Sequence, residues 1–130
     1  MNNLVRAVVG ILRRDNKFLV AKRPEGKPYS GYWEFPGGKI EVNESAEHAL
    51  TRELHEELGI HVLASQSWYI TKHAYPDKTV ELHLWLVTEF SGEPHSKENQ
   101  ELRWATLDEM LSLKLLEGNW AVMERVKGLI

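Results

Sequence analysis

The sequence contains no cysteine. This absence excludes a disulfide framework, a thiolate nucleophile and cysteine-ligated zinc or iron–sulfur centres. Long apolar runs are also missing, because no stretch approaches the roughly 18 apolar residues of a membrane-spanning helix. Residues 1–7 have neither an apolar core nor a small-residue cleavage site, so we expect no secretory leader. These absences favour a cytoplasmic protein with no membrane partner.

Runs of lysine and arginine are absent too. The 16 Lys and Arg residues are outnumbered by 19 Asp and Glu residues, which gives a formal net charge of −3. A nucleic-acid polymer is therefore not an expected partner, whereas a small molecule is. No two of the six histidines have the spacing of a zinc-binding helix. The 130 residues suit one globular domain over residues 1–130, as a monomer or homodimer.

Strands and helices are intermixed along the chain. Apolar and β-branched runs predict strands at residues 4–12, 18–21, 33–35, 68–75 and 79–90. We expect the first two strands to form one hairpin and the last two to form another. Polar loops are expected between them, including one at residues 91–99. The chain mixes α-helices with β-strands, so its class is α/β in the broad sense. Because hairpins replace a strict strand–helix alternation, the α+β type is indicated, with a mixed sheet and helices packed on it.

Three helices are predicted. The clearest covers residues 45–58, where Asn43 or Ser45 can cap the start and Gly59 follows the end. A capping-box pattern, Thr106-x-x-Glu109, opens a short second helix. The last helix follows residue 119.

The first helix carries three carboxylates on one side, because Glu53, Glu56 and Glu57 stand at positions i, i+3 and i+4. A solvated acidic face is the ordinary explanation of such a group. A helical wheel places Glu57 inside the apolar stripe and Glu53 at its edge, however; the stripe is formed by Ala46, Leu50, Leu54 and Leu58. Carboxylates in such a place need cations, and Arg52 alone cannot balance three. Divalent magnesium or manganese can.

A tight turn at Gly37-Gly38 precedes this helix and lets the backbone approach a ligand or metal. The whole segment matches the Nudix box: Gly, five residues, Glu, seven residues, then Arg-Glu-apolar-any-Glu-Glu-any-Gly-apolar. The matching residues here are Gly38, Glu44, Arg52, Glu53, Leu54, Glu56, Glu57, Gly59 and Ile60. Residues 34–41 and the flanking strand pattern resemble the MutT-like branch of this family, and the likeness runs along nearly the whole chain.

The resemblance implies a Nudix fold, a mixed β-sheet sandwiched between α-helices. It also implies a magnesium-dependent hydrolase, with manganese as a possible substitute. In the MutT-like branch, water attacks the β-phosphorus of a nucleoside triphosphate and releases the monophosphate and pyrophosphate. The biological outcome implied is sanitation of the nucleotide pool, which prevents mutation.

The resemblance also assigns roles within the box. Glu56 and Glu57 are expected to ligate metal, and Glu53 to act as general base or as a ligand that orients the water. Arg52 is expected to hold Glu53 through charge-assisted hydrogen bonds. Glu44 should support the metal or Arg52.

Two further metal contacts are implied by the same resemblance. A backbone carbonyl at Gly37 or Gly38 should complete one coordination shell, and of the two we expect Gly38. Glu98, in a polar loop, corresponds to an additional metal-ligating glutamate, with Glu101 as its possible substitute. A solvated loop charge is the alternative explanation of Glu98.

Four residues match positions that contact the nucleotide in the MutT-like branch. Asn119 stands where an asparagine reads oxidised guanine, although it could equally be a helix N-cap. Arg23 and Phe35 match pocket positions, with a surface charge and a core residue as the alternatives. Lys78 replaces an arginine that closes over the base, which keeps the charge but loses planar stacking.

We therefore expect 8-oxo-dGTP as the preferred substrate. Other (d)NTPs, such as pyrimidine nucleoside triphosphates, are the main alternative within the family. A non-catalytic Nudix domain that binds a nucleotide or a partner protein is the alternative of another class. Such domains usually lose glutamates of the box, and here all are present.

Overall fold

The apolar run at the start of the chain forms the centre of a mixed sheet. The structure, a computed structural model, describes residues 3–129, so the two ends of the expected 1–130 domain lie outside it. Strand β1 (Asn3–Ile11) lies between β5 (Gly37–Lys39) and β7 (Lys78–Ser91), and β6 (His61–Ala74) pairs with the far side of β7. The β1–β7 pair is parallel, and the other two pairs are antiparallel.

A second sheet is wholly antiparallel. It contains β2 (Arg13–Arg14), β3 (Lys17–Lys22), β4 (Trp33–Glu34) and β8 (Glu101–Ala105), with β3 paired to all three others. The predicted hairpin between residues 4–12 and 18–21 is therefore wrong, because β1 pairs with β5 and β7, and of the two strands that precede β3 only the short β2 pairs with it. The long β1 carries buried residues on both faces, such as Val8 and Val9. A strand buried on both faces needs a position inside a sheet with helices packed on each side, which a hairpin alone cannot supply.

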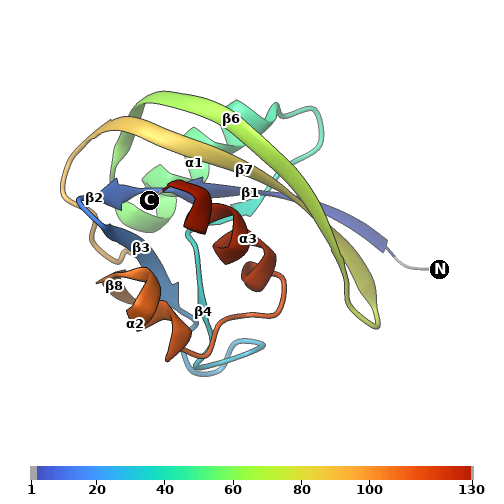
Figure 1. Cartoon of the computed structure of the whole chain (residues 1–130). Coiled ribbons are helices and arrows are strands. Elements are labelled where there is room, and N and C mark those ends of the chain that lie inside the picture. Colours follow the sequence, from blue (N-terminus) through green and yellow to red (C-terminus); the bar gives the residue numbers. More distant parts are fainter. Residues whose placement is uncertain (1–2, 130) are drawn as a thin grey trace.

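Helices cover both faces of the mixed sheet, as Figure 1 shows for α1 and α3. Leu50, Leu54 and Leu58 of α1 (Ala46–Leu58) pack with Val8 of β1 on one face. On the other face Leu84 of β7 packs in a cluster that includes residues of α2 (Leu107–Leu111) and α3 (Asn119–Val126). A short 3-10 helix, η1 (Lys127–Leu129), ends the described chain. The predicted sandwich of a mixed sheet between helices is confirmed.

The helix ends follow from local chemistry. Ser45, rather than Asn43, caps α1, because its side chain accepts the His48 N–H. Gly59 ends α1 in the left-handed conformation, with φ of 70°. The predicted capping box of Thr106 and Glu109 is present at α2. None of the helices within residues 3–129 is long and apolar enough to cross a membrane.

Gly10 allows α1 to lie close to the sheet. A Cβ there would stand 2.9 Å from the Leu54 Cδ1 atom and 3.2 Å from the Leu50 Cδ1 atom. The glycine thus brings the helix that carries the predicted catalytic carboxylates against β1, next to β5. Gly37 and Gly38 do not form the predicted tight turn; they lie in β5 and pair with Val9 and Val8 of β1.

Candidate active site

The three carboxylates of α1 differ sharply in their surroundings. Glu57 is buried, with 5% of its surface exposed, and lies among the helix's buried apolar residues as the wheel predicts. Glu53 is half-buried and Glu56 is exposed. The helix therefore presents a gradient from a buried to a solvated carboxylate along its last two turns.

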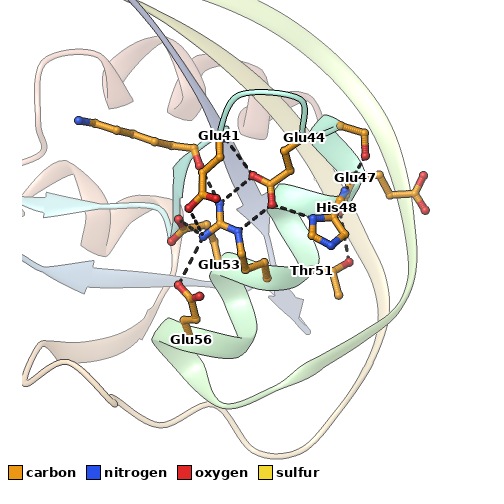
Figure 2. A network of polar contacts seen from close by, with 10 residues as sticks. Glu41, Glu44, Glu47, His48, Thr51, Glu53 and Glu56 are labelled. Atoms are coloured by element: carbon orange, nitrogen blue, oxygen red, sulfur yellow. Dashed lines mark hydrogen bonds and ion pairs between the residues drawn. The ribbon is translucent and has the colours of Figure 1, made fainter.

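A guanidinium organises the N-terminal part of this site (Figure 2). Arg52 donates from Nε and Nη2 to the two carboxylate oxygens of Glu44, at 2.7 and 2.8 Å. Its Nη1 donates to Glu53 at 2.8 Å and, more weakly, to Glu56 at 3.4 Å. A further hydrogen bond runs from Nη2 to the Lys39 carbonyl oxygen at 3.0 Å.

The structure thus brings Arg52 and Glu53 together in the geometry that the sequence predicts. It also places Glu44 against Arg52, which was one of its two expected positions. The hydrogen bonds from Arg52 hold the pKa of Glu44 far below its usual range, so this carboxylate stays charged. Because Glu44 occupies two of the guanidinium's donors, Arg52 can only partly neutralise Glu53.

The two glycines of β5, Gly37 and Gly38, touch two of the carboxylates. A Cβ at Gly38 would overlap the carboxyl group of Glu53, and a Cβ at Gly37 would overlap the backbone carbonyl of Val8. The backbone N–H of Gly37 hydrogen-bonds to the carboxyl group of Glu57. Both glycines are therefore required because backbone, strand and carboxylates approach within contact distance.

Burial raises the pKa of Glu57 to about 8. The nearby carboxylates of Glu34, Glu98 and Glu53 add to the rise, and only the Gly37 hydrogen bond opposes it. Burial also raises the pKa of Glu53, against the pull of Arg52. The charges of Glu53 and Glu57 are therefore not fully compensated by the surrounding protein. The atoms that these two side chains offer to a metal ion are all oxygens. A hard divalent cation fits such a set.

The acidic side chains of the site do not form a complete metal-coordination shell. Within residues 3–129, no three acidic or histidine side chains converge closely enough, as oriented, to enclose a metal ion. The carboxylates of Glu53 and Glu56 are turned toward Arg52 instead. The metal roles of Gly38, Glu53, Glu56, Glu57 and Glu98 remain predictions.

The loop after β7 decides between the two candidate glutamates outside the box. His95 N–H donates to the Leu58 carbonyl at 3.0 Å and Lys97 N–H to the Glu57 carbonyl at 3.1 Å, which fastens this loop to the end of α1. The charge of Glu98 acts on both Glu53 and Glu57. Glu101 instead lies in β8, opposite Lys22. These observations favour Glu98 over Glu101 as the glutamate that acts on the carboxylates of α1.

A cavity of about 410 Å³ begins at these glycines. Its lining includes Gly37 and Gly38, together with all four residues predicted to contact substrate: Arg23, Phe35, Lys78 and Asn119. These four come from β3's end, the β4–β5 segment, β7 and α3, so the fold collects them from separated parts of the chain.

Asn119 is not a helix N-cap. Gly118 holds that position, and Asn119 begins α3 as a buried residue. Its Oδ1 accepts the Phe35 N–H at 3.0 Å. Because a backbone N–H can only donate, this contact fixes which end of the amide is oxygen. The Nδ2 donors have no hydrogen-bond acceptor among residues 3–129, which leaves them for a ligand.

Arg23 and Phe35 are more than a surface charge and a core side chain. Arg23 is mostly buried and donates to both carboxylate oxygens of Glu34, at 3.1 and 3.2 Å, and to the Pro28 carbonyl. Phe35 is buried in the core and also lines the cavity, and its N–H holds Asn119. Lys78 lines the same cavity, with its Nζ 5.9 Å from the Tyr75 ring centroid.

Sequence reasoning missed several residues of the cavity. Glu34, in the segment that matches the family, has no role predicted from the sequence, although it accepts hydrogen bonds from Arg23 and its charge raises the pKa of Glu57. Its position between buried Trp33 and Phe35 could have signalled a separate, polar face. Tyr75 and three further residues, Tyr29, His73 and Gly118, also line the cavity, and no pattern in the sequence indicated them.

Residues 2–126 match the family model of the NUDIX domain. The chain is 36% identical to a CTP pyrophosphohydrolase of Escherichia coli K12 over 128 residues, covering 97% of this chain and 93% of that protein. It is 33% identical to an 8-oxo-dGTP diphosphatase of the same strain over 126 residues, covering 96% and 98%. The crystal structure of a MutT NUDIX hydrolase from Burkholderia pseudomallei superposes with a TM-score of 0.87 at 30% identity, covering 96% of this chain and 99% of that one.

Proposed function

Because the chain belongs to the Nudix hydrolases, we propose that it converts nucleoside triphosphates to the monophosphate and pyrophosphate, with 8-oxo-dGTP preferred. The observation that carries this proposal is the single cavity that joins two kinds of chemistry. One end holds a hydrogen-bond donor for a base at Asn119, and the other reaches Gly38 against the Glu53 carboxyl group.

The base end favours a carbonyl oxygen. Asn119 Oδ1 accepts the Phe35 N–H, which turns the amide so that its Nδ2 hydrogens are available to donate to a ligand. The O6 atom of 8-oxoguanine accepts such a hydrogen bond, whereas adenine carries an amino group at that position. A missing partner for a buried donor costs binding energy, so adenine nucleotides should be poor substrates.

The phosphate end requires cations. Nudix hydrolases need divalent metal ions, and we infer that Mg²⁺, with Mn²⁺ as a substitute, is held by the Gly38 carbonyl and the carboxylates of Glu53, Glu56, Glu57 and Glu98. The bound ion supplies charge neutralisation on the phosphate oxygens. The raised pKa values of Glu57 and Glu53 support this assignment, since a nearby cation favours the charged carboxylates.

The chain's own residues orient the attacking water. We assign Glu53 as the general base that accepts a proton from water as the new bond to the β-phosphorus forms and the bond to the bridging α–β oxygen breaks. That oxygen leaves with the monophosphate. Arg52 holds the Glu53 carboxylate at 2.8 Å, and Glu44 in turn holds Arg52 through two hydrogen bonds.

Hydrolysis of CTP is the second candidate. A CTP pyrophosphohydrolase is among the relatives that cover nearly the whole chain. Cytosine also has a carbonyl oxygen, O2, that could accept from Asn119. The same donor therefore suits both bases, and the choice between them depends on how each fills the cavity.

A substrate panel tests the proposal. The purified protein with Mg²⁺ is given 8-oxo-dGTP, dGTP, CTP and dATP, and the kcat/KM values for pyrophosphate release are compared. We expect 8-oxo-dGTP to exceed dATP by at least about tenfold, the size of one well-placed hydrogen bond, because adenine offers no carbonyl oxygen to Asn119. Guanine and cytosine do offer one, so we expect 8-oxo-dGTP to exceed dGTP and CTP through its fit to the cavity. A higher value for CTP would instead establish the second candidate. No hydrolysis of any nucleotide would refute the proposed reaction.

A further inference from the structure

At the end of the cavity where Asn119 lies, a tyrosine hydroxyl accepts a hydrogen bond that joins two separate elements. Tyr75 lies where β6 turns toward β7, and its hydroxyl oxygen accepts the Gly118 N–H at 3.0 Å. Gly118 directly precedes Asn119, the predicted base-reading residue. Tyr75, Gly118 and Asn119 all line the same cavity. The two elements involved, the β6–β7 hairpin and α3, can be followed in Figure 1.

The segment that leads into α3 is held differently on its two sides. Toward β4 it forms three hydrogen bonds: Trp33 N–H to the Lys114 carbonyl, Leu116 N–H to the Trp33 carbonyl, and Phe35 N–H to Asn119 Oδ1. Toward the β6–β7 hairpin, the contact of Gly118 with Tyr75 is the one hydrogen bond within residues 3–129. The Tyr75 hydroxyl thus supplies the hydrogen bond that holds Gly118 toward the hairpin. It acts beside a looser ion pair of Glu117 with His73, at 3.7 Å, and the stacking of Arg125 on the Tyr69 ring, at 3.6 Å.

Tyr75 also satisfies a backbone donor at the start of α3. Gly118 is the N-cap of α3 and has no side chain to hydrogen-bond the first turn. The Tyr75 hydroxyl satisfies the cap's own N–H from outside the helix. The Tyr75 ring is itself held, because the His73 ring meets it edge-on at a centroid distance of 4.5 Å.

The contact leaves little room at Gly118. A Cβ there would stand 3.0 Å from the Tyr75 hydroxyl oxygen and 3.6 Å from the His73 Cβ. The backbone of Gly118 is helical, with φ of −64°, so alanine would be allowed by the backbone and opposed only by this neighbour. Gly118 and Tyr75 thus form a fitted pair.

We propose that Tyr75 is a positioning residue that sets the place of Asn119 at the base end of the cavity through its hydroxyl bond to Gly118. This inference rests on the proposed function and adds a specificity determinant to it. The ring of Tyr75 contributes to the cavity wall, and its hydroxyl group contributes the position of the donor that the base meets.

The first test is Tyr75→Phe, which removes the hydroxyl and keeps the ring. We expect KM for the preferred nucleotide to rise about three- to tenfold, the range of one net hydrogen bond, with kcat nearly unchanged. The ratio of kcat/KM between the preferred nucleotide and dATP should fall by a similar factor. Tyr69→Phe is the matched control, because Tyr69 lies in β6, six residues before Tyr75 and outside the cavity lining, and the substitution keeps the ring on which Arg125 stacks.

A double-mutant cycle tests the same contact from its other side. Gly118→Ala should raise KM in the wild-type background, because its Cβ crowds the hydroxyl oxygen. In the Tyr75→Phe background that oxygen is gone, so Gly118→Ala should add little. Additive effects of the two substitutions on KM would overturn the proposal. So would a KM for Tyr75→Phe equal to that of Tyr69→Phe.

A ligand-free measurement separates this inference from the proposed reaction. In ¹⁵N–¹H NMR spectra, Tyr75→Phe should shift the Gly118 backbone amide and the Asn119 side-chain amide, and Tyr69→Phe should shift neither. An unmoved Asn119 amide would refute the positioning role even if the enzyme is fully active. Absence of nucleotide hydrolysis by the wild type would refute the proposed function, while the NMR result would still decide the positioning role.

Discussion

Glu53 combines burial, a fixed partner and contact with backbone, which are the properties of a poised base. The Arg52 hydrogen bond at 2.8 Å fixes its carboxylate, and Gly38 leaves room for that carboxylate against β5. Burial raises its pKa toward the range in which a carboxylate accepts a proton effectively. The role of Glu53 therefore follows from its surroundings as well as from its place in the box.

Replacing Glu53 by glutamine tests this role. The glutamine oxygen can still accept from Arg52, but the side chain can no longer take a proton. We expect kcat to fall by roughly 10²- to 10⁴-fold, with the melting temperature changed little. Glu47→Gln, at an exposed site on the same helix, should retain full turnover. Near-normal turnover by Glu53→Gln would show that another group is the base.

Asn119 allows a sharper substitution than removal. Asn119→Asp keeps an oxygen for the Phe35 N–H but replaces the Nδ2 donors by a second acceptor. We expect the preference for 8-oxo-dGTP over dATP to be lost, with kcat/KM for 8-oxo-dGTP reduced about tenfold or more, because two acceptors would face each other. Asn119→Ala should lose the preference as well. A preference retained in both variants would exclude Asn119 from base reading.

Single residues were predictable where their role depends on near neighbours in the chain. The helical wheel placed Glu57 in the apolar stripe because residues three and four positions apart share a helix face. Asn119 remained ambiguous because its partner, the Phe35 N–H, lies 84 positions away. Tyr75 was missed for the same reason, since nothing near it indicates a hydrogen bond to Gly118, 43 positions later.

At the scale of elements, α1 places an acidic group inside an apolar face, and this has a pH signature. Glu57 has a pKa of about 8 in the folded chain, against 4.5 for an ordinary glutamate. Between these values the folded chain holds a proton that the unfolded chain has released. The resulting stability is fully present below pH 4.5 and is lost as pH rises through about 8.

Metal-free protein in EDTA should therefore lose stability, on the order of a few kcal/mol, from pH 5 to pH 8.5. Thermal melting across this range measures the loss. Glu57→Gln should flatten the profile, because it carries no titrating group at this site, and Glu47→Gln should melt like the wild type. Addition of Mg²⁺ at pH 8.5 should raise the melting temperature of the wild type more than that of Glu57→Gln. Identical profiles for Glu57→Gln and the wild type would contradict the buried carboxyl account.

Elements with strong local signals were predicted well, and those without them were not. The helix predicted at residues 45–58 has a capping serine, a helical spacing of apolar residues and a glycine after its end. Helix α1 matches this prediction within one residue. Strand β6 begins at His61 rather than at residue 68, because it is an edge strand with three irregularities in its pairing and no regular alternation. Strand β8 was not predicted, since its five residues pair only with β3, far away in the chain.

At the scale of the whole molecule, the mixed sheet acts as the frame that joins the two ends of the cavity. Strand β5 carries the glycines that meet α1, and β7 carries Lys78 to the lining of the same cavity. The parallel β1–β7 pair connects these two regions. The mixed sheet was predictable from the order of elements. The cavity was not, because its walls come from segments that only the folded chain brings together.

The central claim is that this cavity directs water to the β-phosphorus of a bound nucleoside triphosphate. Hydrolysis of 8-oxo-dGTP in ¹⁸O-labelled water, followed by mass spectrometry of the products, tests it directly. Attack at the β-phosphorus breaks the bond to the bridging oxygen, so the account predicts the label in pyrophosphate and unlabelled 8-oxo-dGMP. Label in the monophosphate, or release of labelled orthophosphate from the γ-position, would contradict it.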